Sequence, residues 1–86
     1  MPEERPSLHA LEAIVRQQLA PSFSANEIDP ILAEAEADNP AAEFIVATAL
    51  ESGGERDEAT KWYRRSAQQG YRPALERLGR DASHVA

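Results

Sequence analysis

The stretch DEATKWYRRSAQQG, residues 57–70, decides the fold of this chain. Its apolar and small residues recur at spacings that place them on one face of an α-helix. They are Ala59, Trp62, Tyr63, Ser66, Ala67 and Gly70. The chain's single tryptophan, Trp62, is central on this face and has small neighbours, which suits an aromatic ring lying across another helix. The stretch therefore predicts a helix packed on other helices, supported by an Asp57–Lys61 ion pair and ended by Gly70 in the left-handed conformation.

The run from Ala59 to Gly70 reads A-x-x-W-Y-R-R-S-A-x-Q-G and resembles the second helix of a Sel1-like repeat, a relative of the tetratricopeptide repeat. Downstream, the opening of a following repeat is matched by Ala74, Leu78 and Gly79. The resemblance covers residues 39–79. It departs from the family pattern at residues 45–46, where the family carries Leu-Gly, and in the short loop at residues 52–55. It implies an all-α fold, a short right-handed array of antiparallel helix hairpins.

An internal repeat supports that expectation. The pattern P-A-x-E-x-I at residues 40–45 recurs as P-A-x-E-x-L at residues 73–78, an offset of 33. A period near this length is typical of helix–turn–helix solenoids. Pro6 aligns with Pro40 at an offset of 34, which makes the first two helices a degenerate repeat.

Helical spacing and boundary residues predict about five helices. A helix over residues 8–20 carries an apolar stripe of Leu8, Leu11, Ile14, Val15 and Leu19. A helix over residues 40–51, capped by Asn39, carries a principal stripe of Ala41, Phe44, Ile45, Thr48 and Ala49, with Leu50 at its border. The last helix starts at Arg72-Pro73, and Gly79 either ends it or is the small residue of a helix crossing. We expect a flexible N-terminus at 1–6, one helical-repeat domain at 7–80 and a flexible tail at 81–86.

Pro30 leaves two readings of the second helix open. Ser24 and Glu27 form a capping-box pattern, with Phe23 and Ile28 as a hydrophobic staple, so a helix capped by Ser24 could contain and bend at Pro30. Alternatively, Asp29 caps a helix that has Pro30 at its favoured first position. Because a proline in a helix interior costs about 3 kcal/mol, we favour a short turn at 24–28 and a main helix at 29–37.

Composition indicates a soluble helical protein. The 86 residues are 42% hydrophobic and 28% charged, with no cysteine, which excludes a disulfide framework. No apolar run reaches the length of a membrane span, and the acidic, proline-containing start is unlike a signal peptide, so we expect a cytoplasmic protein that binds no membrane. Residues 1–58 hold 13 acidic and three basic side chains and residues 59–86 hold two and six, so the halves carry −10 and +4. This disfavours binding of nucleic acid, at least by the first two-thirds of the chain.

No group of residues in the sequence forms a chemical site. His9 and His84 lack a second ligand at metal spacing, so we predict no metal and no cofactor. Glu34, Glu36 and Asp38 fit a solvated helix end better than an acid/base pair or a calcium loop. The glycines at 53–54 lack the lysine of a phosphate loop. We therefore predict that the chain is not an enzyme.

Two surfaces are candidates for partner binding. A basic edge consists of Lys61, Arg64 and Arg65, followed by Arg72, Arg77 and Arg80. It binds an acidic partner or the acidic half of a second copy, or it neutralises the carboxylates near it. The resemblance also implies an inner surface lined by the first helix of each pair, and its candidate exposed contacts are Glu43, Ala47, Glu51, Arg77 and Arg80.

The leading hypothesis is a non-catalytic protein–protein interaction module, an adaptor or small regulatory binder of another protein or peptide. The alternative is an acidic inhibitor or immunity-type protein that uses residues 27–58 to occupy a basic site on an enzyme or nucleic-acid-binding protein. The dependence of affinity on ionic strength distinguishes the two hypotheses, because a charge mimic loses affinity steeply as ionic strength rises. We also predict a weak homodimer through the helix at 8–20, whose apolar stripe is wider than one neighbour covers. Sedimentation equilibrium, with Val15→Glu as the control, tests it.

Overall fold

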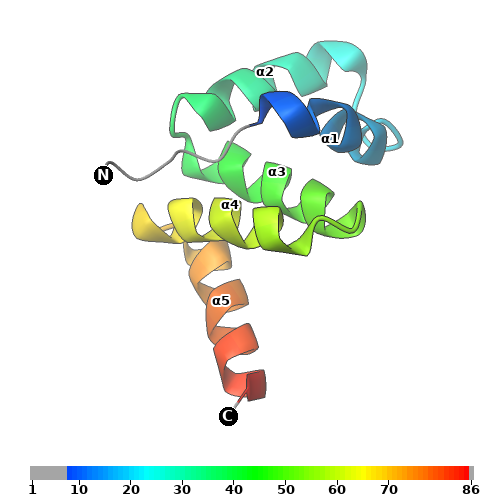
Figure 1. Ribbon diagram of the computed structural model, residues 1–86. Coiled ribbons are helices and arrows are strands. Elements are labelled where there is room, and N and C mark those ends of the chain that lie inside the picture. The colour runs from blue at the N-terminus through cyan, green and yellow to red at the C-terminus, as the bar shows by residue number, and fades with distance from the viewer. Residues whose placement is uncertain (1–7, 86) are drawn as a thin grey trace.

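The computed structural model describes residues 8–85, and all regular structure within that range is helical (Figure 1). The elements are a 3-10 turn η1 (His9–Leu11) and the helices α1 (Glu12–Leu19), α2 (Ala25–Glu36), α3 (Pro40–Ser52), α4 (Arg56–Gln68) and α5 (Arg72–Val85). The prediction of an all-α chain with about five helices is confirmed for this range. The expectation for residues 1–6 falls outside it, and α5 continues past Asp81, where a tail was predicted to begin. None of the helices in this range has the length and apolar character needed to cross a bilayer.

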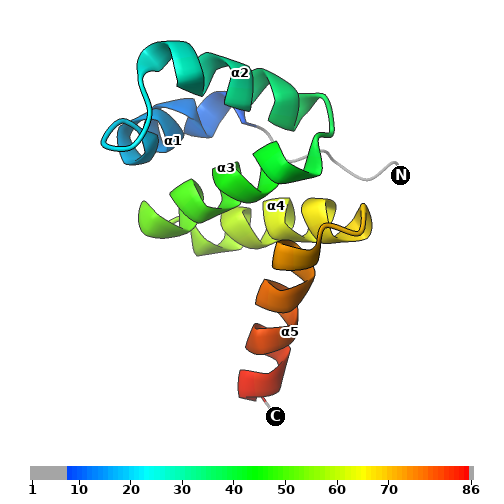
Figure 2. The same cartoon turned by 180° about the vertical axis from the view of Figure 1, so that it is seen from behind.

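The central helix is α3. It contacts α1 and α2 on one side and α4 on the other, while α5 contacts α4 and projects away from the rest (Figures 1 and 2). The buried side chains of the first four helices form one hydrophobic core, to which α5 adds Ala74 and Leu78 at its first turns. α3 makes most of its contacts with α1, α2 and α4.

The helix predicted from the opening stretch is correct in its buried face. Trp62 and Tyr63 are 2% and 3% exposed, and Ala59 and Ser66 are buried beside them. Gly70 has a φ of +83°, as predicted for the residue after this helix. The expected ion pair is wrong in its partner, because Lys61 Nζ lies 3.1 Å from Glu58 Oε1, one turn back on the helix.

The second helix follows the reading that was not favoured. α2 is one continuous helix from Ala25, capped by Ser24, whose N–H donates to Glu27 Oε1 at 2.8 Å in a capping box. Pro30 lies inside this helix and is exposed. The capping box satisfies backbone groups of the first turn, and Ile28 N–H already donates to the Ser24 carbonyl at 3.0 Å. The proline therefore removes one hydrogen bond, to the carbonyl four residues back, on the solvent side of the helix.

The cap predicted for α3 is correct, and the predicted stripe is correct in part: Ala49 and Leu50 are buried, and Phe44 and Ile45 are partly buried against the core. The Asn39 side-chain oxygen accepts hydrogen bonds from the N–H groups of Ala41 at 3.0 Å and Ala42 at 3.3 Å. The residues that are buried are Ala42, Glu43, Val46, Ala47, Ala49 and Leu50. A single stripe cannot describe this helix, because it is covered by α1 and α2 on one side and by α4 on the other.

The apolar stripe of the first helix is covered within the chain. Leu8, Val15 and Leu19 are 4%, 0% and 6% exposed, and Leu11 packs against the same core. Ile14 lies against the end of α3, where a Cβ placed on Gly53 would come within 2.5 Å of Ile14 Cγ2. Leu8, Val15 and Leu19 are therefore not available to a second copy, whereas Leu11 and Ile14 are half-buried.

Candidate functional site

Two residues proposed for an exposed inner surface are inside the protein. Glu43 and Ala47 are both 0% exposed. They lie on the side of α3 that faces α4, because residues of α4 bind Glu43 directly. The sequence-based prediction was wrong here because it assigned the polar side chain of Glu43 to solvent. The groups that bind this carboxylate come from α4 and its C-terminal end.

The buried carboxylate of Glu43 is the centre of a polar cluster between α3 and α4. Arg65 Nε donates to Glu43 Oε2 at 3.1 Å, and Gln69 Nε2 donates to Glu43 Oε1 at 2.6 Å. Arg65 also pairs with Asp38 at the end of α2, and its guanidinium lies 5.8 Å from the Trp62 ring centroid. Burial raises the pKa of Glu43, and the hydrogen bond from Arg65 opposes that shift. These groups join α2, α3 and α4 and serve the fold.

A second polar group fixes α5. Glu51 on α3 accepts a hydrogen bond from the Tyr63 hydroxyl at 2.9 Å and forms an ion pair with Arg77 of α5. The Arg77 guanidinium lies 5.4 Å from the Tyr63 ring centroid. Two of the predicted contact residues, Glu51 and Arg77, are therefore brought together and bind each other.

The predicted basic edge is divided. Lys61 and Arg64 are exposed on α4, whereas the Arg65 side chain is only 23% exposed and is engaged by Glu43 and Asp38. For Arg80, the structure describes the backbone, which belongs to α5. The edge that is open to a partner is therefore narrower than the sequence suggested.

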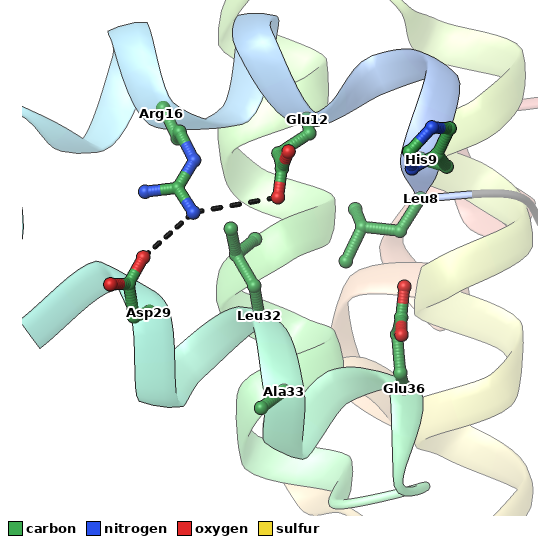
Figure 3. A pocket seen from close by; sticks show the side chains of 8 residues that line it. All are labelled: Leu8, His9, Glu12, Arg16, Asp29, Leu32, Ala33 and Glu36. Carbon is green, nitrogen blue, oxygen red and sulfur yellow. Dashed lines mark hydrogen bonds and ion pairs between the residues drawn. The ribbon is translucent and has the colours of Figure 1, made fainter.

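A cleft lies between η1, α1 and α2 (Figure 3). It has a volume of about 230 Å³ and is lined by Leu8, His9, Glu12, Arg16, Asp29, Leu32, Ala33 and Glu36. Leu8 and Leu32 are buried at its floor, and Glu36 projects from α2 toward the end that holds Leu8 and His9. Pockets for drug-sized ligands start at about 300 Å³. This cleft therefore has room for one side chain of a partner.

The charge around the cleft is mainly negative. Three carboxylates surround it, and Arg16 lies between two of them: its Nη2 is 2.7 Å from Asp29 Oδ1 and 3.4 Å from Glu12 Oε1 (Figure 3). The hydrogen bond with Asp29 is the main cause that raises the pKa of Arg16, so this guanidinium stays charged. Glu36 extends the acidic rim on the other side of Leu32. Two carboxylates of the cleft, those of Glu12 and Asp29, therefore already bind one guanidinium, that of Arg16.

Sequence reasoning missed this cleft. The spacing of Glu12 and Arg16, four residues, and of Asp29 and Glu36, seven residues, places each pair on one helical face. This spacing does not predict whether the charged face of α1 lies against that of α2. Among residues 8–79, no three histidine or carboxylate side chains gather as metal ligands would.

Comparison with known proteins gives no match to a protein family, to a curated protein or to a solved structure.

Proposed function

We propose that this chain is a non-catalytic protein-interaction module, an array of antiparallel helix hairpins resembling Sel1 and tetratricopeptide repeats, that binds a basic segment of another protein in the α1–α2 cleft. The observation that carries the proposal is the cleft itself. An apolar floor of Leu8 and Leu32 is bordered by Glu12, Asp29 and Glu36, with one guanidinium among them.

A lysine or arginine side chain fits such a cleft. Its aliphatic stem covers apolar surface while its charged end reaches the carboxylates. Arginine suits the site best, because its planar guanidinium can donate to two carboxylate oxygens at once. The Arg16–Asp29 pair, at 2.7 Å, provides an example of that contact at the same rim.

The test is a titration of the ¹⁵N-labelled chain with a short peptide of alternating leucine and arginine, followed by amide chemical shifts. We expect shifts concentrated on η1, α1 and α2. Ala33→Arg places a long side chain in the cleft from an exposed position and should weaken binding at least about tenfold, through both volume and charge. Ala13→Arg, an exposed alanine of α1 outside the cleft lining, is the matched control.

Equal binding by both variants would contradict the proposal. So would shifts that centre on α4 or α5, because the peptide would then bind elsewhere.

A second function, an acidic inhibitor that occupies a basic site, is favoured by the exposed carboxylates of this half of the chain. The side chains of Asp29 and Asp38 are 64% and 56% exposed. An inhibitor of this kind would lose affinity steeply as salt increases and would respond equally to Ala33→Arg and Ala13→Arg, since each adds the same charge. Binding in the cleft responds to the position of the arginine, so the pair of variants separates the two functions.

A further inference from the structure

The outer face of α5 is open along its described part. Ala74 is fully buried against the body, and Leu78 packs on the core from the same side. Leu75 is 50% exposed, and Glu76 and Gly79 are exposed beside it. Figures 1 and 2 show α5 projecting from α4 with no helix alongside its outer length.

The start of α5 and the start of α3 share the sequence pattern P-A-x-E, and on α3 this pattern is covered by α4. Pro40 and Glu43 of the P-A-x-E pattern face α4. The Ser66 hydroxyl donates to the Pro40 carbonyl at 2.8 Å. Arg65 and Gln69 donate to the Glu43 carboxylate at 3.1 and 2.6 Å. The segment Arg65-Ser66-x-x-Gln69 of α4 is therefore the complement of P-A-x-E on α3.

On α5 the pattern returns at an offset of 33, with Pro73 for Pro40 and Glu76 for Glu43. Both residues are exposed, and among the described residues no helix covers them as α4 covers α3. We propose that the outer face of α5 binds an amphipathic partner helix that carries Arg-Ser-x-x-Gln, with the serine on the Pro73 carbonyl and the arginine and glutamine on Glu76. This inference does not depend on the function proposed for the α1–α2 cleft.

Charge and burial agree with this occupant. Glu76 offers a carboxylate at the place where Glu43 accepts two hydrogen bonds from a cation and an amide. Leu75 stands at the position of Ala42 of α3, which is 6% exposed, so a covering helix would also remove apolar surface from water. A purely acidic helix would place like charges against Glu76, and a purely apolar one would leave its carboxylate without a partner.

The test appends a copy of residues 54–70 directly after Ala86 of the full chain. At the offset of 33, Ala86 is the counterpart of Gly53, so the copied helix has the connection that joins α3 to α4. Tethering makes docking intramolecular and raises its effective concentration. We expect the unfolding midpoint to rise by about 5 °C or more and the amides of α5 to become more protected from hydrogen exchange.

A charge swap tests the contact itself. Glu76→Arg in the extended chain should abolish most of the gain, and replacing the arginine copied from Arg65 with glutamate should restore it. In the unextended chain Glu76→Arg should leave the midpoint nearly unchanged, because the residue is exposed.

Three results would overturn the proposal. The first is an extended chain with no gain in midpoint and no added protection of α5. The second is a gain that Glu76→Arg does not reduce. The third is a dimer of the unextended chain that Leu75→Glu dissociates, because a second copy would then occupy the face.

Discussion

Trp62 combines deep burial with an unsatisfied donor. The side chain is 2% exposed, and its Nε1–H has no hydrogen-bond acceptor. We expect Trp62→Ala to cost about 3–5 kcal/mol, because it leaves a large cavity in a small core. Trp62→Phe should cost less than about 2 kcal/mol, since it leaves a smaller cavity and removes a buried donor without an acceptor.

Chemical denaturation of the two variants gives both values. Native-like unfolding of Trp62→Ala would place the indole outside the core. A phenylalanine variant as unstable as the alanine variant would mean that the shape of the indole, and not its volume, determines the packing.

Glu43 predicts a dependence of stability on pH. Burial raises its pKa above the ordinary carboxyl value, against the effect of Arg65. The folded state therefore holds this proton more tightly than the unfolded chain does, and the group contributes most to stability at acidic pH. That contribution declines as pH rises from the ordinary pKa through the raised one. Relative to Glu43→Gln, the wild-type free energy of unfolding should fall as pH rises above the ordinary glutamate pKa of about 4.

Denaturant titrations of the two proteins at several pH values measure this difference. A rise in wild-type stability relative to the variant over the same range would contradict the expectation. It would mean that the ion pair with Arg65 outweighs burial and lowers the pKa.

At the scale of the helices, three ends share one geometry. After α2, α3 and α4 the chain passes through a residue of positive φ, at Asp38, Gly54 and Gly70. At each end the N–H of the next residue donates back to a carbonyl five residues earlier, as Tyr71 does to Ser66 at 3.3 Å. This is the Schellman arrangement, and it satisfies carbonyls that a helix end leaves open.

Two glycines make a matched test of that geometry. Gly70 has a φ of +83°, Gly79 is inside α5, and a Cβ on either would meet no atom within 4 Å. Gly70→Val should therefore cost more than about 1 kcal/mol through the left-handed backbone alone. Gly79→Ala should stabilise the chain by about 0.5–1 kcal/mol through helix propensity.

Thermal and chemical unfolding of both variants check the signs. If Gly70→Val left the midpoint unchanged, helix α4 would continue past this glycine in solution. If Gly79→Ala destabilised the chain, α5 would end near that residue.

The helices differ in how far their sequence predicts them. α4 packs through one face, so its 3.6-residue spacing identified Trp62 and its buried neighbours correctly. α3 is covered on two sides, and a single-stripe reading misassigned Glu43 and Ala47 to the surface. In α2 the capping box was recognised, but the cost of Pro30 was given more weight than the support that this box provides to the first turn. Local rules were sufficient for α4, whose buried residues share one face, and insufficient for α3, which is covered on two sides.

At the scale of the whole molecule, the cleft depends on how α1 and α2 pack against each other. No local sequence pattern predicts that packing. The cleft forms because α1 and α2 bring Arg16 and Asp29, 13 residues apart in the chain, to 2.7 Å. The sequence did indicate an acidic N-terminal half, and the cleft is where that charge surrounds apolar surface. Two basic residues of the other half bind carboxylates of the first half, Arg65 those of Glu43 and Asp38 and Arg77 that of Glu51. The separation of charge along the chain is therefore partly neutralised inside the fold.

The burial of the apolar stripe of the first helix makes self-association through that helix unfavourable. A dimer through the first helix needs an open apolar stripe, yet Leu8, Val15 and Leu19 are buried in the chain's own core. Within the described range, Leu75 is the large apolar side chain that stays exposed, and exposed ion pairs between copies contribute only about 0–1 kcal/mol each. We therefore expect sedimentation equilibrium to give a single monomeric species up to high micromolar concentration. Val15→Glu is unsuitable as a control, because a charge at a fully buried position would unfold the core.

Ala13→Glu, at an exposed position of α1, replaces it as the control. A dimer that this variant dissociates would show that the surface of α1 does associate, through its half-buried residues Leu11 and Ile14. A dimer that survives the variant but dissociates in high salt would show that charge between the two halves outweighs apolar contact, against the small energies of exposed pairs.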